Sequence, residues 1–562
     1  MKALLRMLRF TALAASAFAL LLLVAPSVSA QEQAAPARFD VVVYGATPGG
    51  VSAAISAARM GDRVALIGYQ QHVGGMSTSG LGKSDIEKRE MIQGLFKEFV
   101  DKVHAHYLDF YGEGHPDLPL CHDGYYYEPH VAEEIFDELL AAEKTLTVFR
   151  GHRLLRAKTE NNRLTAITIR SRKEENPSEP RPTALRSDLT IQGAVFIDAT
   201  YEGDLLAAAG AEYRLGREGR DEFQEPHAGV IYFDYKTKEI LPGTTGEADD
   251  RLPAYTYRLC LTTNPKKGFH LTEPPAGYDR QHYVGYFEDL ANGLLDGPKN
   301  FKPGRGYNPK HFGTLVRALS VTYIPNEMTD VNINPRPLAF PFPELNVGYI
   351  EGDDRQRQEI CDLHRNRVLG LIWFLQNDEE VPAAHRELAR ELYFPDEEFT
   401  DNHGFPFQLY IREGRRLVGE YTLIEQDITG TGENREPKRY PDSIAVGEFP
   451  IDSFPCQQKQ PGDTVVLEGY LGLLDHITRP YEIPYRIMVP KQVDGLLVPV
   501  AASTTHVAFS SVRMEPTWMA LGQAAGVAAH LAIENNQPAR QIDTTELQQI
   551  LRSQNHVVNL PE

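Results

Sequence analysis

The chain has few cysteines, few tryptophans and almost no long apolar runs. Its 562 residues include four cysteines and two tryptophans, and no two cysteines stand in a C-x-x-C spacing. Iron–sulfur clusters are held by closely spaced thiolates, so the cysteine pattern argues against an iron–sulfur protein. The cysteines can be free thiols or can form disulfides, and if all four are paired, three pairings are possible. The four residues are Cys121, Cys260, Cys361 and Cys456.

Basic residues are also in the minority. The chain has 57 Lys+Arg against 77 Asp+Glu, which gives a formal net charge of −20. Binding to nucleic acid needs concentrated Lys and Arg, so we expect no nucleic-acid partner. Apolar residues make up 42% and charged residues 24%, which is the composition of an ordinary globular protein. This composition excludes a disordered, fibrous or polytopic membrane protein.

One apolar run lies at the N-terminus, at positions 10–24. It follows three basic residues and precedes the small residues Val28, Ser29 and Ala30, and this order is typical of a secretory signal peptide. The run is shorter than the roughly 20 residues that a membrane span needs. We therefore expect residues 1–30 to be cleaved, which leaves a net charge of −23 and no membrane span. The mature protein is expected in the periplasm or medium of a bacterium.

Residues 40–68 predict one βαβ unit that binds a dinucleotide. An apolar strand at 41–43 enters a Gly-Pro-rich turn, a helix rich in small residues follows, and a second strand begins at residue 63. In such a unit the turn backbone contacts a pyrophosphate, and the helix start offers free N–H groups and a positive dipole end. The cofactor-binding residues that this unit predicts are Gly45, Thr47, Pro48, Gly49 and Gly50.

This fingerprint departs from the usual pattern at two positions. Thr47 stands where the middle glycine is usual. Gly68 ends the second strand, where an acidic residue normally binds the adenosine ribose. Ribose recognition must then come from elsewhere, and Gln70, Gln71 and the backbone are the candidates.

A second glycine doublet follows the second strand, in the sequence Gly74-Gly75-Met76. With these motifs the chain resembles the FAD-dependent oxidoreductase family, whose N-terminal pattern is G-x-T-P-x-G and then G-G-M. This family belongs to the glutathione-reductase-like superfamily of flavoproteins with two dinucleotide-binding domains. Three later segments carry the resemblance toward the C-terminus: Asp198-Ala199-Thr200 after a strand, residues 408–417, and residues 503–530.

The resemblance implies an α/β fold. We expect a Rossmann-like FAD-binding domain with a parallel sheet and a β-meander, plus a large inserted α+β region that faces the substrate. The FAD-binding domain would comprise residues 38–214 and 491–562, and the insert residues 215–490. The further cofactor-binding residues that the resemblance implies are Gly74, Gly75, Met76, Asp198, Ala199, Thr200, Gly522 and Gln523.

Patterning predicts several further elements. Residues 145–172 alternate as a β-meander, residues 173–188 are a polar loop, and a strand at 191–197 returns to the FAD sheet. An apolar stripe predicts a helix at 355–377. The resemblance directs the start of the alanine-rich helix 515–534 toward the pyrimidine end of the flavin, where the helix dipole would stabilise negative charge.

Hydride transfer from an alcohol to a flavin needs a base for the substrate proton, and histidine suits neutral pH. His506, just before the helix expected to face the flavin, is the first candidate, and His403 is the second. Arg412 lies in a charged segment at 412–416 and is the third, because its guanidinium can clamp a carboxylate or the FAD pyrophosphate. The alternatives are a structural histidine and a solvated helix face of ion pairs. No metal site is predicted.

These features predict an exported FAD-dependent dehydrogenase or oxidase that transfers hydride from a small organic substrate, a sugar or polyol, to flavin. A polysaccharide lyase-type enzyme stays open, because relatives of this kind are sometimes labelled xanthan lyases. A heterodisulfide-reductase-A-like electron carrier without its clusters also stays open. A second G-x-G-x-x-G is missing between the FAD motifs, which disfavours an NAD(P)H-dependent mechanism. The electron acceptor and the oligomeric state are open.

Overall fold

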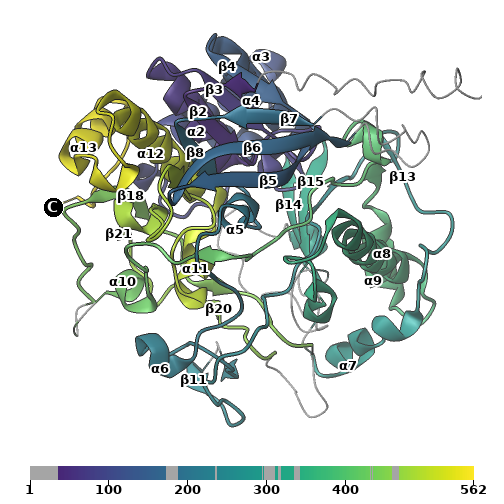
Figure 1. Cartoon of the computed structure of the whole chain (residues 1–562). Coiled ribbons are helices and arrows are strands. Elements are labelled where there is room, and N and C mark those ends of the chain that lie inside the picture. Colours follow the sequence, from purple (N-terminus) through teal and green to yellow (C-terminus); the bar gives the residue numbers. More distant parts are fainter. Residues whose placement is uncertain are drawn as a thin grey trace, which may run out of the picture. The chain divides into compact units, whose positions relative to one another are not determined.

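The computed structural model describes residues 36–172, 188–234, 237–293, 295, 310–313, 315, 318–333, 342–430, 432, 435–458 and 467–561. Residues 1–37 and 38–562 form two units, and the following description concerns the second of them (Figure 1). The predicted signal peptide at 1–30 lies outside the described residues, as does the predicted polar loop except for its last residue, Asp188.

A five-stranded parallel sheet is the centre of the predicted nucleotide-binding fold (Figure 1). Its strand order is β22-β8-β2-β3-β4, and each neighbouring pair is parallel. Short apolar strands of this kind are buried on both faces, and all four residues of β2 are buried. The strands are β2 (Val41–Tyr44), β3 (Val64–Ile67), β4 (Leu146–Phe149), β8 (Val195–Asp198) and β22 (Leu496–Leu497).

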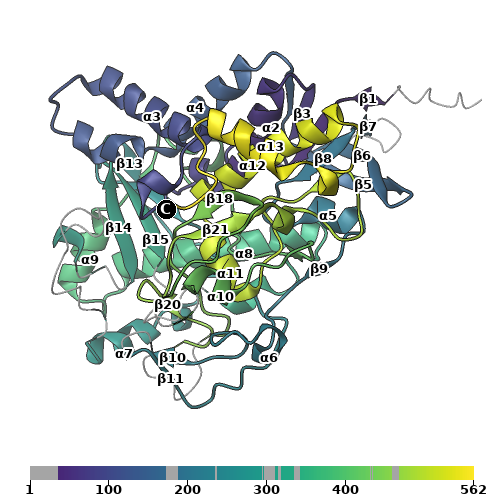
Figure 2. The same ribbon diagram turned by 90° about the vertical axis from the view of Figure 1, so that its left-hand side faces the viewer.

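Two helices of small residues pack against each other beside this sheet (Figures 1 and 2). They are α2 (Pro48–Arg59), which joins β2 to β3, and α12 (Glu515–Glu534), which has the predicted bounds. A Cβ atom on Gly522 would overlap the carbonyl oxygen of Gly49. The missing side chains therefore allow a helix from the end of the chain to lie against the first helix of the fold.

The β-meander is an antiparallel sheet of β5 (His152–Glu160), β6 (Arg163–Ser171) and β7 (Leu189–Gln192). The predicted start of the meander at residue 145 is wrong, because residues 146–149 form β4 of the parallel sheet. The single strand predicted at 191–197 is wrong, because β7 ends in the meander and β8 enters the parallel sheet. The break falls at Gly193, where a Cβ would lie 2.8 Å from a methyl carbon of Val42. Because Gly193 has no side chain, the backbone can lie close to Val42 at the point where the chain leaves the meander for the parallel sheet.

The region between β8 and β22 contains the longest helix, α8 (Asp354–Asn377), which begins one residue before the predicted position. The carboxylate of Asp353 caps it by accepting a hydrogen bond from the Gln356 amide at 2.9 Å. A three-stranded antiparallel sheet of order β12-β15-β14 lies in the same region. Its strands are β12 (Leu259–Thr262), β15 (Met328–Ile333) and β14 (Leu319–Ile324).

Other elements connect these parts. The helices are α3 (Leu95–Tyr111), α4 (Pro129–Ala142), α5 (Asp204–Ala208), α6 (Arg220–Phe223), α7 (Gly285–Ala291), α9 (Ala383–Arg390), α10 (Glu425–Thr429), α11 (His506–Val512) and α13 (Thr544–Ser553). The short strand pairs are β9 (Tyr213–Arg214) with β17 (Arg416–Leu417), β10 (Phe233–Asp234) with β11 (Glu239–Ile240), β13 (Gly268–Phe269) with β16 (Phe394–Pro395), β18 (Ser443–Gly447) with β21 (Tyr481–Pro484), and β19 (Asp452–Ser453) with β20 (Gly472–Leu473).

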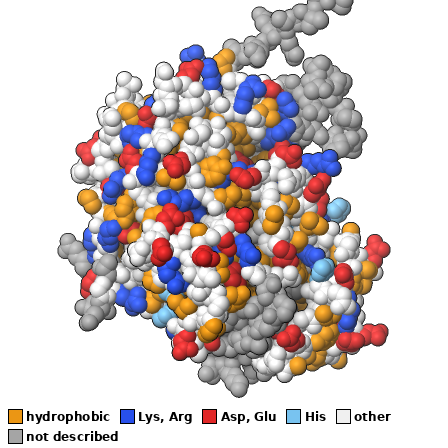
Figure 3. Space-filling model, turned by 60° about the horizontal axis from the view of Figure 1, so that its bottom comes forward, with side chains coloured by type: hydrophobic (Ala, Val, Ile, Leu, Met, Phe, Trp, Pro, Cys, Tyr) orange, Lys and Arg blue, Asp and Glu red, His pale blue; other side chains and the backbone are white. Residues whose placement is uncertain are grey.

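All four cysteines are free thiols, so the disulfide alternative is wrong. Cys121, Cys260 and Cys456 are buried and Cys361 is half-buried. Within the described parts of the chain, no helix has both the length and the apolar character needed to cross a bilayer. On the face shown in Figure 3, acidic and basic side chains are interspersed with scattered hydrophobic ones.

Candidate functional site

The glycine turn and the start of α2 form a backbone cradle at the carboxyl edge of the parallel sheet. Gly45 has a φ of +108°, and a Cβ there would lie 2.5 Å from the carbonyl carbon of Ala199. A Cβ on Gly50 would overlap the Gly45 carbonyl oxygen. The Thr47 hydroxyl caps α2 by accepting from the Gly50 amide at 3.2 Å, and it donates to the Ala199 carbonyl at 2.8 Å. Thr47 in the middle position thus fixes the turn.

A pocket opens at this cradle. Its wall includes the backbone of Gly45, Ala46 and Thr47 and the segment 68–72 after β3. Bare backbone beside the free N–H groups of a helix start is what a pyrophosphate requires. The residues present therefore fit a dinucleotide such as FAD.

No acidic side chain follows β3 at the ribose end of this pocket. Gln70 and Gln71, the candidates for ribose recognition, both line its wall. Arg172 also lines the pocket; its guanidinium lies 4.1 Å from the centre of the Tyr69 ring and donates to Gln70 Oε1 at 3.4 Å. Amide and guanidinium groups therefore stand where an acidic residue is usual.

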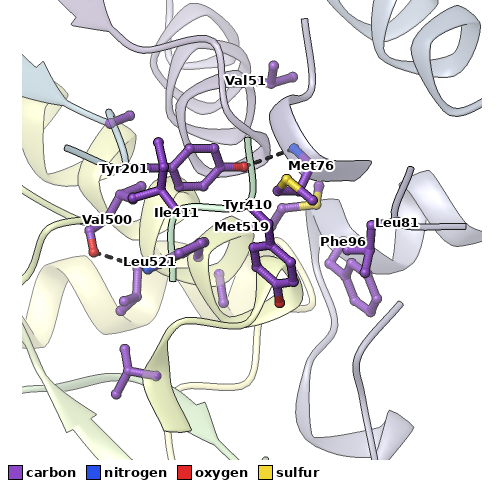
Figure 4. Packing of buried hydrophobic residues seen from close by; sticks show 14 of the residues in the cluster. Val51, Met76, Leu81, Phe96, Tyr201, Tyr410, Ile411, Val500, Met519 and Leu521 are labelled. Carbon is purple, nitrogen blue, oxygen red and sulfur yellow. Dashed lines mark hydrogen bonds between the residues drawn. The ribbon is translucent and has the colours of Figure 1, made fainter. Parts of the chain in front are cut away.

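The second glycine doublet lies beside Tyr201 (Figure 4). Gly75 has a φ of +50°, and a Cβ there would overlap the Tyr201 hydroxyl. That hydroxyl accepts from the Met76 amide at 3.0 Å and donates to Glu515 Oε1 at 2.7 Å. One side chain thus joins the G-G-M loop to the first residue of α12.

The Glu515 carboxyl is buried at the start of α12. Burial raises its pKa to about 8, although the hydrogen bond from Tyr201 acts in the opposite direction. The carboxyl is therefore mostly neutral at pH 7. A carboxylate there would compensate the positive end of the helix dipole, and a neutral acid leaves that end available to negative charge on a ligand.

The residues after β8 hold the adjacent turn. Asp198 is fully buried and accepts from the amides of Thr200 and Leu206 at 3.0 and 2.7 Å. Burial raises its pKa to about 7. Thr200 lines the pocket, while the backbone of Ala199 packs closely against Gly45. Within the protein, Asp198 orders the turn through these backbone contacts.

The two predicted cofactor residues on α12 have different surroundings. Gly522 faces α2, where it contacts the Gly49 carbonyl. The Gln523 side chain accepts from the Leu95 amide at 2.9 Å and donates to Gln554 at 2.8 Å. Gln523 lines a separate groove and does not belong to the wall of the cradle pocket.

His506 is buried at the first position of α11, where it pairs with a carboxylate. Its Nδ1 atom lies 2.7 Å from Oε2 of Glu413, and its amide donates to Glu218 at 2.9 Å. Burial opposes the charged imidazolium, but the charges and hydrogen bonds of Glu413 and Cys456 outweigh it and raise the pKa to about 10. His506 therefore carries a proton at neutral pH.

The charged segment 412–416 contains no helix, so the alternative of a solvated helix face is wrong. Its charged side chains are buried. Arg416 pairs with Glu218 at 2.6 Å and with Glu413 at 2.9 Å. A Cβ on Gly414 would lie 2.6 Å from the carbonyl oxygen of Tyr201. This close passage brings the segment, and with it the Glu413–His506 pair, beside Tyr201.

Among the described residues Arg412 has no carboxylate partner, and its guanidinium lies over two aromatic rings. Its guanidinium lies 3.6 Å from the centre of the Phe454 ring and 4.3 Å from that of Tyr410. Nη1 donates to the Ala254 carbonyl at 2.8 Å, and neither Nε nor Nη2 has a hydrogen-bond partner in the described part of the chain. Burial lowers the pKa of Arg412 to about 9.

Residues that were not predicted from the sequence complete this polar region. The Tyr410 hydroxyl accepts from Arg513 Nη1 at 3.2 Å, and Arg513 also pairs with Asp452 at 3.2 Å. Arg258 pairs with Asp330 at 2.8 Å. The sequence gives only a weak signal for these contacts, because the partners are far apart along the chain. Tyr410 is the exception, since it stands next to the charged segment 412–416.

His403 is exposed and has a φ of +56° at the end of a short 3-10 turn. Its neighbours Asp401 and Asn402 line the cradle pocket, whereas His403 does not. The structure therefore brings Arg412, Glu413 and His506 into one buried region and leaves His403 at the surface.

One group of side chains has the composition of a metal site: Glu128, His130 and Glu398, with ligand atoms within 4.8 Å of one another. Each is already hydrogen-bonded. Glu128 accepts from Tyr107, and His130 Nδ1 lies 2.5 Å from Glu398. The pKa of His130 is raised to about 9 by its bond to Glu398, against the effect of burial. A proton on the imidazole thus occupies the position that a metal would need.

Comparison with known proteins identifies the family. The chain matches the family described as FAD dependent oxidoreductase over residues 40–551. No curated protein matches it. Among solved structures, it is similar to THI4 of Thermovibrio ammonificans (22% identity, 32% of this chain and 66% of that one, TM-score 0.21). It is also similar to a geranylgeranyl bacteriochlorophyll reductase-like protein of Thermoplasma acidophilum (13% identity, 92% and 84%, TM-score 0.34).

A further similar structure is the flavin-dependent monooxygenase PieE, solved with FAD and substrate (16% identity, 33% and 34%, TM-score 0.20). This chain covers less than two thirds of the length of THI4 and of PieE. The family match, by contrast, spans almost the whole chain and includes the glycine cradle, the doublet and α12. The protein therefore belongs to the FAD-dependent oxidoreductase family, and it is an enzyme with FAD as its cofactor.

Proposed function

We propose that the protein is an exported FAD-dependent dehydrogenase or oxidase that takes hydride from a small organic substrate, a sugar or polyol. The observation that carries this proposal is the buried Glu413–His506 pair, 2.7 Å apart, on a segment that passes beside Tyr201. A carboxylate that orients an imidazole is a common arrangement for moving a proton. When bound, FAD supplies the hydride acceptor.

The protein groups would handle the charge and the proton. Glu413 holds the Nδ1 proton of His506, which leaves Nε2 as the atom for proton exchange, and the Cys456 side chain also hydrogen-bonds this imidazole. With a pKa of about 10, His506 is cationic at neutral pH and stabilises negative charge on a substrate oxygen. Neutral His506, which becomes more abundant as pH rises, accepts the hydroxyl proton. The Arg, Asp and Tyr groups around Tyr410 offer donors and acceptors to further hydroxyls.

Export is supported by the signal-like sequence at 1–30. It would be tested by expressing the full chain in a bacterium and determining the N-terminus of the exported product. A mature protein that begins at Gln31 agrees with the proposal. An uncleaved protein retained in the cytoplasm contradicts it.

The chemistry would be tested with FAD-loaded protein mixed anaerobically with sugars, polyols and amines, while the flavin absorbance is followed. We expect a sugar or polyol to bleach the oxidised flavin, and His506→Asn to slow this step while FAD stays bound. If every organic donor leaves the flavin oxidised, the proposal fails. Parallel incubation with uronate polymers in the absence of FAD tests the lyase alternative, because unsaturated products would form there without flavin.

A further inference from the structure

Arg412 is a buried cation that no carboxylate of the described residues contacts. The residue is 1% exposed, and the one hydrogen bond that it makes to the described part of the chain goes to the Ala254 carbonyl oxygen. The carboxylates of the region contact the other two arginines: Asp452 pairs with Arg513, and Asp330 and Asp85 pair with Arg258. Burying an unpaired charge is strongly unfavourable. The two buried donors of Arg412 that have no acceptor among the described residues therefore call for an acceptor group from a ligand.

The unused donors of Arg412 indicate the shape of that group. Nε and Nη2, the two donors without partners, lie on the same edge of the guanidinium plane. This edge makes two parallel hydrogen bonds to the two oxygens of a carboxylate. One unpaired positive charge also matches the single charge of a carboxylate better than the two charges of a phosphate monoester.

His364 provides a second unpartnered polar atom in the same region. It lies on α8, is 2% exposed, and its Nε2 has no partner in the described structure. Burial and then the charge of Arg412 lower its pKa to about 3, so the imidazole is neutral. Both residues adjoin one short segment: Arg412 bonds the Ala254 carbonyl, and the His364 ring lies 6.4 Å from the Tyr255 ring.

We propose that Arg412 and His364 bind a carboxylate of the substrate, so that the substrate is a sugar acid or polyol acid and not a neutral sugar. This inference rests on the proposed function, because it names the class of substrate for the same site. Arg412 makes the bidentate contact and neutral His364 adds a hydrogen bond. The position is near the flavin-facing elements, since the adjacent Glu413 and Gly414 lead to His506 and Tyr201.

The test uses FAD-loaded mature protein and pairs of ligands that differ in one carboxylate: glucuronate with glucose, galacturonate with galactose, and gluconate with glucitol. Binding is measured by calorimetry for wild type, Arg412→Met, Arg412→Lys and His364→Asn. Arg486→Met is the control, because Arg486 also lies over an aromatic ring (Tyr421) but is paired with Asp442. FAD content and the thermal midpoint are recorded for each variant.

We expect at least one acid to bind about tenfold or more tightly than its neutral counterpart. Arg412→Met should weaken the binding of that acid by about 10- to 100-fold and leave the binding of the neutral counterpart unchanged. Arg412→Lys should recover part of the loss. The thermal midpoint of ligand-free Arg412→Met should not fall, since a buried unpaired charge is removed. A midpoint that falls in Arg412→Met alone would show a structural role and overturn the inference.

Two other outcomes also overturn the inference. If Arg412→Met loses FAD, the anion belongs to the cofactor and not to the substrate. If the acids and their neutral counterparts bind wild type equally, the substrate has no carboxylate at this position. Failure of the proposed function is seen separately, because there no acid, sugar or polyol reduces the flavin, whatever its affinity.

Discussion

The Tyr201 hydroxyl donates a 2.7 Å hydrogen bond to the neutral, buried carboxyl of Glu515. The same oxygen accepts from the Met76 amide, so a single atom connects three segments that are 125 and 314 residues apart in sequence. Those segments are the G-G-M loop, the turn after β8 and the start of α12. The geometry of the flavin-facing region therefore depends on this oxygen.

Removing the oxygen tests that dependence. Tyr201→Phe leaves the Met76 amide and the Glu515 carboxyl without their partner, and a lost buried hydrogen bond of this kind costs about 1–3 kcal/mol. We expect that loss in the free energy of unfolding, measured by denaturant titration, together with weaker FAD binding. Tyr481→Phe is the control, since its buried hydroxyl bonds Ser511 at 2.8 Å elsewhere. Equal FAD affinity in both variants would contradict the expectation.

A methyl group in the glycine cradle should exclude the cofactor. In Gly50→Ala the new Cβ would overlap the Gly45 carbonyl oxygen, so the turn must open where the pyrophosphate binds. We expect purified Gly50→Ala to retain its fold by circular dichroism and to lack the yellow colour of bound flavin. Gly285→Ala, with open space around the new methyl, should retain full FAD content. A fully flavinated Gly50→Ala would argue against this turn as the cofactor site.

The ionisation of His506 predicts an alkaline rise in activity. Because a base must first lose its own proton, and the pKa of His506 is raised from 6.5 to about 10, flavin reduction should accelerate with pH up to about 10. The measurement is the anaerobic reduction rate against pH. His506→Asn should flatten the profile while FAD content stays constant. A wild-type profile that levels near pH 7 would show that another group accepts the proton.

The same shift makes stability depend on pH. A histidine whose pKa is raised on folding contributes stability that is fully present below its ordinary pKa and is lost as pH passes the raised value. The stability difference between wild type and His506→Asn should therefore be largest below pH 6.5 and vanish above about pH 10. Denaturant titrations across this range would measure it. A difference that stays constant with pH would contradict the assigned ionisation.

The raised pKa of Glu515 gives a pH dependence of the same sign, in this case through an acid. A buried acid with a raised pKa stabilises the fold in its neutral form, so its contribution is present below pH 4.5 and is lost as pH rises through about 8. Glu515→Gln preserves a neutral group, so we expect it to match wild type at acid pH and to be the more stable of the two above about pH 8. Thermal midpoints over this range test the expectation. Equal pH dependence in the two proteins would exclude it.

Much of the nucleotide-binding fold can be predicted from sequence because its signals are local. The strand at β2, the glycine turn, α2 and α12 follow from apolar runs and small residues within short windows. The separation of β7 from β8 could not be predicted, because it depends on contact between Gly193, in the turn between these strands, and Val42 of β2, which is far away in the sequence.

The candidate site is less predictable. His506, Arg412 and the cradle glycines are visible as motifs, but the partners that give them chemistry are not. Glu413 reaches His506 across 93 positions, and Arg412 is distinguished by having no carboxylate partner among the described residues, which no local pattern encodes. His364 lies on a long helix, where its sequence context shows only a periodic apolar face. Burial turns these ordinary charged residues into candidates for function.

The contact between Gly49 and Gly522 also sets an order of events during synthesis. The cradle begins within the first tenth of the chain, yet α12 and β22, which complete its surroundings, are made last. Non-local contacts of this kind form only when both partners exist. A nascent chain that lacks its final 70 or so residues consequently cannot assemble the cofactor site. The cofactor therefore binds late, after translation of the chain is nearly finished.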